Sequence, residues 1–574
     1  MEEYVVTLRN KEDLDDFYND METPGGDLYI PDRAVDLQLR RQISRNTHYM
    51  LTPEEVIELK NDPRVLDVES ANRIRSTQDA YTGFDEGGTF DRQNYLPVSG
   101  DKNWGLYRHV IGANALSGEW GFDGTDAITV ADYTITASGK NVDVLIVDTV
   151  INTTAMNHPE FAVNADGTGG TRFKMFNWFG LNSALGYGVN GTYDYSNDGE
   201  THGIHVAGTA AGNTQGWARD ADIYNIQPFG QNHGAGNVDG ELDKLRYWDY
   251  IRQWHNTKPI NSETGRRNPT ISNHSYYSFH GRTSGTYRKF DDSNMERETV
   301  AGVGVFNYRG SIYDKWGDDG SDLSDAELRA RGIVIDSNGD FKIPFWSTAM
   351  QADVDDAADD GIIFVTAAAN QSAKITKSGD QDYNNRIYWR VGSNQYSDSD
   401  LSHRPASTNA GSHPNAINVG SLDVLKNDRK AGFSNTGNAV NIYAAGYAII
   451  SARGDNTGHF LDSRNSLYSM HKQSGTSMAA PQVAGVLALL AESNPGLTQA
   501  EAKAWLEANA TNNVMYDTGT DSSTDFESLQ SGINKVLRWI NQRPESGASF
   551  PKVNAKVRPT SGSVYPRPRI RRRG

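Results

Sequence analysis

The most informative stretch of the chain is Ser474-Gly475-Thr476-Ser477-Met478-Ala479-Ala480-Pro481-Gln482-Val483-Ala484-Gly485. It places Ser477 among small residues and continues as an apolar run, 483–490, that predicts a closely packed helix. Backbone N–H groups at a helix N-terminus favour developing negative charge, so a hydroxyl held there is well placed for nucleophilic attack. A serine that only caps a buried helix would give the same pattern. A base and a carboxylate elsewhere in the chain would separate the two interpretations.

A candidate carboxylate, Asp148, directly follows the apolar run 142–147. Near-continuous hydrophobicity over six residues is typical of a parallel strand buried on both faces. The carboxyl end of such a strand lies at the ligand crevice of an open α/β sheet. Asp148 is therefore expected at a functional edge of the sheet.

Three segments together resemble the subtilisin-like serine proteases, or subtilases. They are GTSMAAP followed by VAG around Ser477, Asp148 with the later His158-Pro159-Glu160-Phe161, and Thr201-His202-Gly203-Ile204-His205-Val206-Ala207-Gly208-Thr209. The resemblance implies that Ser477 is the nucleophile, His202 the base and Asp148 the carboxylate that orients it. The chain order Asp, His, Ser is that of subtilisin and differs from the chymotrypsin and α/β-hydrolase orders.

The second histidine, His205, is expected to be a helix-packing or hydrogen-bonding residue. A metal site made by His202 and His205 is the alternative, but no acidic partner stands at the spacing of a zincin motif.

A fourth segment, 361–370, is another buried-strand pattern and ends in Asn370. By resemblance, the Asn370 amide and the Ser477 N–H would form the oxyanion hole. An asparagine that caps a loop is the alternative. Three positions depart from the subtilase pattern by added bulk and are expected to crowd the catalytic centre: Val150, Ile204 and Ala369.

The segment Thr270–Tyr277 is strand-like, and the resemblance implies that its backbone pairs with an extended peptide substrate. The implied substrate-binding residues are Asn273, Ser275, Tyr276 and Ala369. A long segment after this strand, 278–345, is predicted to be an insertion, and the loop 167–197 is also enlarged.

The N-terminal part has a strand pattern at 4–8, a helical pattern at 11–21 and a capping box, Thr52-Pro53-Glu54-Glu55, that opens a helix to Lys60. Another strand pattern, 65–69, follows. This order resembles the inhibitor-type propeptide of subtilases, although a generic small α+β domain would have the same elements. Asn103-Trp104-Gly105-Leu106 resembles the start of a mature subtilase, so self-cleavage is expected between Glu69 and Trp104.

The predicted fold is α/β: a subtilisin-like, mostly parallel sheet with helices on both faces, preceded by a small α+β, ferredoxin-like propeptide. The predicted divisions are the propeptide at 1–70, a polar linker at 71–102, the peptidase domain at 103–545 and a basic tail at 546–574. The tail has no acidic residue from 551 onward. Two interpretations of it stay open: it docks to an acidic partner or an assembly, or it is a solvated chain end.

Composition limits the location and the partners. The 574 residues carry a net charge of −18 and no cysteine, so the body is not expected to bind nucleic acid and the redox compartment is undetermined. No apolar run reaches the length of a membrane span and the start lacks a secretory pattern, so we expect a soluble protein. Intracellular and virus-associated locations both stay open.

No cofactor is required by the predicted chemistry. The short segment Gly216-Trp217-Ala218-Arg219 is similar to the proteinase K-type loop, which lacks the longer calcium loop of bacterial subtilisins. The run 336–340 lacks the glutamate of an EF-hand and is predicted to be a β-turn, so structural calcium has no assignable site.

The expected function is a serine endopeptidase acting through an acyl-enzyme on polypeptides, with its own propeptide as a first partner. Two alternatives are a structural or assembly protein of low activity and an esterase or lipase. The second would need a GxSxG elbow, which Ala479 rules out in the segment around Ser477.

Overall fold

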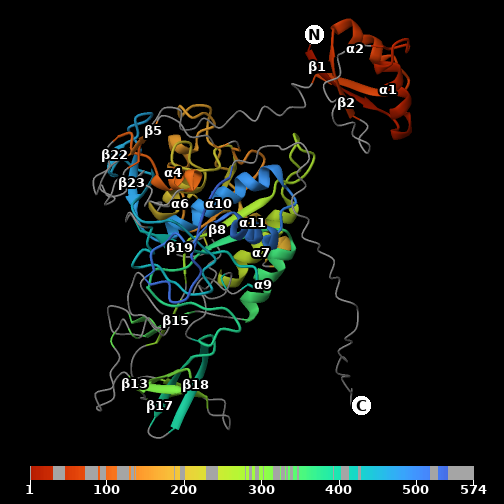
Figure 1. Cartoon of the computed structure of the whole chain (residues 1–574). Helices are drawn as coiled ribbons and strands as arrows, with labels where there is room; N and C mark the ends of the chain where they lie inside the picture. The colour runs from red at the N-terminus through yellow and green to blue at the C-terminus, as the bar shows by residue number, and fades with distance from the viewer. Residues whose placement is uncertain are drawn as a thin grey trace, which may run out of the picture.

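The structure is a computed structural model, drawn in Figure 1. It describes residues 2–29, 46–70, 88–90, 99–112, 128–130, 135, 137–186, 188–193, 195, 201–227, 243–277, 279–282, 287–290, 297–300, 303–314, 324, 327, 330, 334–335, 341–344, 348–391, 394–401, 411, 413–423, 428–517 and 528–540. Most of the predicted linker, the basic tail and the predicted turn at 336–340 lie outside these residues.

An eight-stranded sheet forms the centre of the chain, with the order β24-β25-β20-β19-β16-β8-β6-β7. Every neighbouring pair is parallel except β24 and β25. Its strands are β6 (Asp143–Val147), β7 (Asp222–Ile226), β8 (Thr270–His274), β16 (Ile363–Ala367), β19 (Asn418–Leu422), β20 (Ile442–Ala445), β24 (Thr511–Asn512) and β25 (Lys535–Val536). The strands β6, β8, β16 and β19 are buried at every residue, which explains the mainly apolar sequences of β6 and β16.

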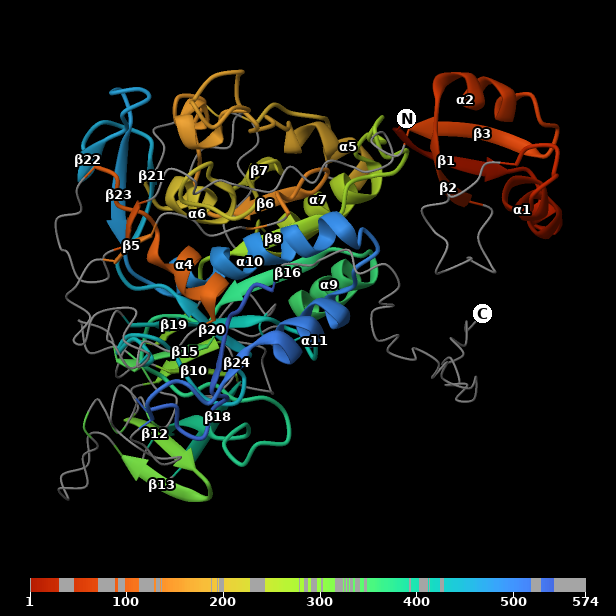
Figure 2. The same ribbon diagram turned by 45° about the horizontal axis from the view of Figure 1, so that its top comes forward.

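The main helices of this part are α4 (Trp104–Ile111), α6 (Thr201–Ala211), α7 (Asp243–Thr257), α9 (Thr348–Asp359), α10 (Thr476–Ser493) and α11 (Gln499–Asn509). Figure 2 shows α10 beside β8 and β16, and α7 and α9 pack on each other. Short helical turns lie between β6 and α6: η3 (Ala155–Asn157), η4 (Pro159–Phe161), η5 (Trp178–Leu181) and α5 (Asn182–Leu185).

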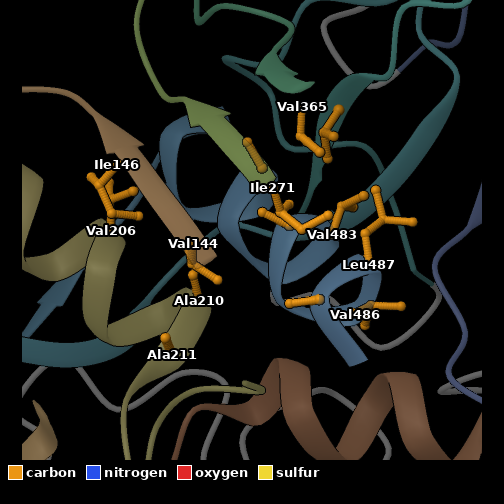
Figure 3. Close-up of a cluster of buried hydrophobic side chains, with 14 of the residues drawn as sticks. Val144, Ile146, Val206, Ala210, Ala211, Ile271, Val365, Val483, Val486 and Leu487 are labelled. Atoms are coloured by element: carbon orange, nitrogen blue, oxygen red, sulfur yellow. The ribbon is translucent and has the colours of Figure 1, made fainter. Parts of the chain in front are cut away.

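Helices cover both faces of the sheet, as two residues of β8 show. Side chains along a strand alternate between its faces, so Ile271 and His274 point to opposite sides. On one face Ile271 of β8 packs in the cluster of apolar side chains that α6 and α10 contribute, shown in Figure 3. On the other face His274 of β8 stacks on Trp248 of α7, with ring centroids 4.9 Å apart. The predicted mostly parallel, two-sided α/β fold is confirmed.

The contact between α6 and α10 depends on a glycine. A Cβ at Gly485 of α10 would lie 2.6 Å from the carbonyl oxygen of Ala210 and 2.6 Å from Cβ of Trp217. No side chain fits at that distance, so Gly485 lets the helix carrying Ser477 lie against the helix carrying His202.

The predicted insertion forms strands of additional small sheets. A three-stranded sheet is ordered β14-β15-β9, and β10 pairs with β11. These strands and the two that begin the next sheet are β9 (Phe279–Arg282), β10 (Tyr287–Phe290), β11 (Arg297–Val300), β12 (Val303–Tyr308), β13 (Ser311–Asp314), β14 (Val334–Ile335) and β15 (Phe341–Pro344).

The four-stranded sheet β13-β12-β17-β18 was not predicted from the sequence. It joins the insertion to two strands that follow Asn370, namely β17 (Arg386–Val391) and β18 (Asn394–Leu401). The inserted structure is thus built from two separate parts of the chain.

The N-terminal part, drawn in red in Figures 1 and 2, has its own hydrophobic cluster. Its antiparallel sheet has the order β2-β1-β3, with both neighbours pairing to β1. The elements are β1 (Glu2–Leu8), η1 (Lys11–Asp13), α1 (Leu14–Glu22), β2 (Asn46–Leu51), α2 (Pro53–Lys60) and β3 (Val65–Ser70). The predicted capping box forms, because Thr52 and Glu55 each accept the other's backbone N–H.

Two small sheets complete the described elements: β4 (Gly88–Phe90) with β5 (Ile128–Val130), and β21 (Ile449–Arg453), β23 (Ser469–Gln473) and β22 (Phe460–Leu461) in that order. Among the helices that the structure describes, none has both the length and the apolar character needed to cross a membrane.

Candidate active site

Asp148 follows directly after β6, which lies between β8 and the edge strand β7 of the parallel sheet. The residue is 2% exposed, and its Oδ1 accepts the backbone N–H of Thr149 at 2.7 Å. A buried carboxylate is therefore held at the carboxyl end of a parallel strand that is paired on both sides, as the sequence predicted.

His202 is the second residue of α6, and its Nδ1 lies 2.7 Å from Oδ1 of Asp148. The histidine side chain is 34% exposed whereas that of Asp148 is 2% exposed, so the pair points from the core toward solvent. The hydroxyl of Thr149 accepts the backbone N–H of Gly203 at 2.9 Å and ties the turn after β6 to the first turn of α6.

Ser477 is the second residue of α10 and is 6% exposed. Its hydroxyl donates to the carbonyl of Ser275 at 2.9 Å, and the hydroxyl of Ser275 donates back to the carbonyl of Ser477 at 2.9 Å. This reciprocal pair fixes the start of α10 to the chain that leaves β8.

Asn370 lies three residues after β16 and next to the start of α10. Its Oδ1 accepts both the backbone N–H of Thr476 at 2.9 Å and the Thr476 hydroxyl at 2.8 Å. With the oxygen so occupied, the amide nitrogen is turned the other way, 3.4 Å from the position of a Cβ on Gly475. The side chain is thus oriented beside the nucleophile segment with a donor that these two bonds leave unused.

The predicted substrate strand is shorter than expected from the sequence. β8 ends at His274 and is paired on both sides, by β6 and β16, so its backbone cannot accept a further strand. Only residues 275–277, beyond the ladder, could pair with a peptide. The pattern alone could not locate this end because the polar and aromatic run continues to Tyr277.

The other predicted substrate-binding residues lie around this end of β8. The Asn273 amide donates to the Ser275 hydroxyl at 2.9 Å. The Tyr276 hydroxyl donates to that of Tyr247 on α7 at 3.0 Å and lies 3.0 Å from Nδ1 of His274. Tyr276 is therefore bound back toward α7.

The three bulky departures are buried: Val150 is 4%, Ile204 1% and Ala369 0% exposed. These side chains therefore belong to the core, and their crowding of the catalytic centre stays a prediction. Ala369 has a φ of +79°, a left-handed conformation that disfavours any residue except glycine.

A family model described as the subtilase family matches residues 139–527 of the chain, which includes the whole of this site. The chain belongs to the subtilase family.

Individual subtilases resemble the chain over shorter stretches. A subtilisin-like protease of Coccidioides posadasii is 43% identical over 81 residues, which is 14% of this chain and 18% of that protein. Subtilisin DY of Bacillus licheniformis is 31% identical over 169 residues, or 29% of this chain and 47% of that protein. The chain thus spans less than half the length of these two relatives.

A solved structure of a cold-adapted subtilisin-like serine proteinase is 21% identical, with a TM-score of 0.39 over 72% of this chain and 94% of that one.

In this subtilase the second histidine is structural, as predicted. His205 is fully buried, and its Nε2 lies 3.0 Å from the carbonyls of Ile449 and His471. Burial lowers the pKa of His205 to about 3, so the ring is neutral one turn away from His202. The described part of the chain contains no group of three or more metal-binding side chains.

The HPEF segment binds this subtilase's short 213–219 loop. Glu160 is fully buried, accepts the N–H groups of Thr214 and Gln215, and pairs with Arg464 at 2.6 Å. Burial alone would raise the pKa of Glu160, but the Arg464 charge and the Thr214 hydroxyl bond outweigh it and lower the pKa to about 2. An arginine thus neutralises the buried carboxylate at this loop.

The sequence analysis missed Asn225 on β7. Its side chain bonds to the backbone on both sides of Asp148. A signal was available, because Asn225 is a lone amide in the run Ile223-Tyr224-Asn225-Ile226, and a buried amide needs hydrogen-bond partners.

Proposed function

We propose that the chain is a serine endopeptidase that hydrolyses polypeptides through an acyl-enzyme on Ser477. The observation that carries the proposal is the 2.7 Å contact between Nδ1 of His202 and the buried Asp148 carboxylate. With Nδ1–H donating to Asp148, Nε2 is the nitrogen whose lone pair can accept a proton. Family membership over residues 139–527 supports the same assignment.

In the proposed reaction Ser477 attacks the peptide carbonyl while His202 takes the hydroxyl proton. Asp148 holds the imidazole in the required tautomer and stabilises the imidazolium. The hydroxyl must first leave the carbonyl of Ser275, to which it donates at rest. His202 then gives the proton to the leaving amine, and water hydrolyses the acyl-enzyme by the same route.

The developing oxyanion would be bound by the Asn370 amide and the backbone N–H of Ser477. The orientation of Asn370 by Thr476 supports this role, because a preorganised donor needs no rearrangement as charge develops. Residues 275–277 would pair with the substrate main chain, with Ala369 and Tyr276 close to the site.

We also propose that the N-terminal unit is a propeptide that the enzyme removes. Asn103 and Trp104 are fully buried: the Asn103 N–H donates to Gln215 Oε1 at 2.7 Å and the Trp104 indole N–H to the Tyr447 carbonyl at 2.9 Å. A cut after this segment would remove both residues and these bonds with the propeptide. The cut is therefore expected upstream of Asp101, after β3 ends at Ser70.

Intact-mass measurement and hydrolysis of a denatured protein substrate test this function. The wild-type chain should shorten to a form that begins between Ala71 and Asp101 and should degrade the substrate. The Ser477→Ala chain should stay full length and should leave the substrate intact. Hydrolysis of the substrate by Ser477→Ala at the wild-type rate would refute the role of Ser477. Equal intact masses of the wild-type and Ser477→Ala chains would refute self-processing.

A structural protein of low activity is not favoured, because the subtilase family match covers residues 139–527 and thus every residue of the proposed site.

A further inference from the structure

A single amide on β7 holds the turn that carries Asp148. Asn225 is fully buried and lies opposite Ile146 in the parallel ladder between β7 and β6. Its Nδ2 donates to the carbonyls of Ile146 at 3.0 Å and Thr149 at 3.2 Å, and its Oδ1 accepts the N–H of Ile151 at 3.0 Å. The three bonds reach the backbone before and after Asp148.

The same turn is connected to both members of the catalytic pair. The N–H of Thr149 donates to Asp148 Oδ1, and the hydroxyl of Thr149 accepts the N–H of Gly203, which follows His202. Because Thr149 is bonded to both Asp148 and Gly203, a shift of Thr149 would move the Asp148 carboxylate and the first turn of α6 together. Asn225 opposes such a shift by binding the Thr149 carbonyl.

Asn225 is itself fixed by aromatic residues of the enlarged loop. Its carbonyl accepts the indole N–H of Trp178 at 3.0 Å and the hydroxyl of Tyr195 at 3.1 Å. Burial raises the pKa of Tyr195 to about 12, so the hydroxyl keeps its proton and remains a donor. Trp178 is also in edge contact with Trp254 of α7, with ring centroids 5.8 Å apart.

We propose that Asn225 is a positioning residue of the catalytic pair: it sets the Asp148 carboxylate against His202 by fixing the turn 148–151, and the 167–197 loop supports it. This inference rests on the proposed peptidase function.

The test compares Asn225→Ala with Asn213→Ala. Asn213 is a matched control because it is 2% exposed and its Nδ2 also bridges backbone carbonyls, those of Pro159 at 3.0 Å and Ala162 at 3.0 Å. Its bonds do not involve the turn at Asp148. kcat, KM, the pH profile of kcat/KM and the thermal midpoint are measured for both variants and the wild type.

Loss of positioning should lower kcat of Asn225→Ala about 10²-fold with little change in KM, because catalysis is sensitive to misplacement of about 1 Å. The acid limb of the kcat/KM profile should move to lower pH by about 0.5–1 unit, because a displaced Asp148 stabilises the imidazolium less. Asn213→Ala should lose thermal stability and keep the wild-type kcat and acid limb.

The inference would be overturned if Asn225→Ala kept the wild-type kcat and acid limb. It would also be overturned if Asn213→Ala showed the lower kcat and shifted acid limb expected for Asn225→Ala. If Asn225→Ala does not fold, Asn225→Ser serves instead, since its shorter hydroxyl cannot bridge both carbonyls and should show the same change in the pH profile. An inactive wild-type chain would count against the peptidase function itself and not against the role of Asn225 alone.

Discussion

At the scale of single residues, Asn370 has two roles that can be separated. Its oxygen accepts from Thr476 and its nitrogen is the proposed oxyanion donor. Asn370→Asp keeps the acceptor and removes the donor. We expect kcat to fall about 10²–10³-fold with KM nearly unchanged, a magnitude known from a subtilisin rather than from this chain.

Steady-state kinetics on a peptide substrate measures this effect. The control is Thr476→Val, which removes the hydroxyl bond to Asn370 and leaves the backbone bond, and should lower kcat much less. An Asn370→Asp variant with the wild-type kcat would exclude the side chain from oxyanion binding.

Ala369 is a strained residue next to Asn370, with a φ of +79°. Glycine adopts this conformation freely, so Ala369→Gly should raise the free energy of unfolding by about 0.5–1 kcal/mol after the added entropy of the unfolded chain is subtracted. Denaturant unfolding measures the change. Ala368→Gly is the control, because Ala368 is equally buried but has no positive φ, and it should be destabilised.

At the scale of elements, a buried ion cluster connects the four-stranded inserted sheet to the chain after Asn370. Asp382 is fully buried and accepts from Lys374 and from Arg309, which lies in the turn between β12 and β13. Asn385 completes the contact, because its oxygen accepts the backbone N–H of Arg309 at 2.9 Å.

Asp382→Asn should lower the free energy of unfolding by about 3–5 kcal/mol, because it leaves the buried Lys374 without its counter-charge. Denaturant unfolding followed by fluorescence gives the value. Asp356→Asn is the control: its pair with Arg252 is exposed on the aspartate side and should contribute about 0–1 kcal/mol. Equal losses in the two variants would show that the cluster does not hold the sheet.

The elements also show what the sequence could predict. β6, β16 and the α10 helix follow from mainly apolar runs, because elements buried on all sides need no polar face. The contact between Asp148 and His202 could be predicted because both segments carry motifs of the family.

Contacts between segments far apart in the chain leave no local pattern, so they could not be predicted. The exchange of bonds between Ser275 and Ser477 and the pairing of β12 with β17 are of this kind. The end of β8 at His274 is set by where its neighbours stop pairing and not by its own residues.

At the scale of the whole molecule, buried histidines make stability depend on pH. Burial lowers the pKa of His205 and of His274 to about 3 and that of His255 to about 4, and holds the pKa of His109 well below its ordinary value. The folded-state pKa is below the unfolded-state value in each case, so the unfolded chain takes up protons first as the pH falls.

Stability should therefore be level above pH about 6.5 and fall below it, by about 2 kcal/mol for each of His205 and His274 at pH 5. The loss continues until the pH reaches the folded-state values. Glu160, with a pKa of about 2 when folded, adds a further loss below about pH 4.5, where the unfolded carboxyl becomes protonated. Calorimetry from pH 8 to pH 4 measures this, and a constant midpoint between pH 7 and pH 5 would contradict it.

The central claim is that Ser477 is a nucleophile activated by His202 and Asp148. Its most direct measurement is the intact mass of the chain after treatment with a fluorophosphonate, followed by peptide mapping of the adduct. We predict one adduct per chain, located on Ser477, with none on Ser477→Ala and much slower labelling of His202→Ala. No adduct on the folded wild-type chain, or the same adduct on Ser477→Ala, would contradict the account.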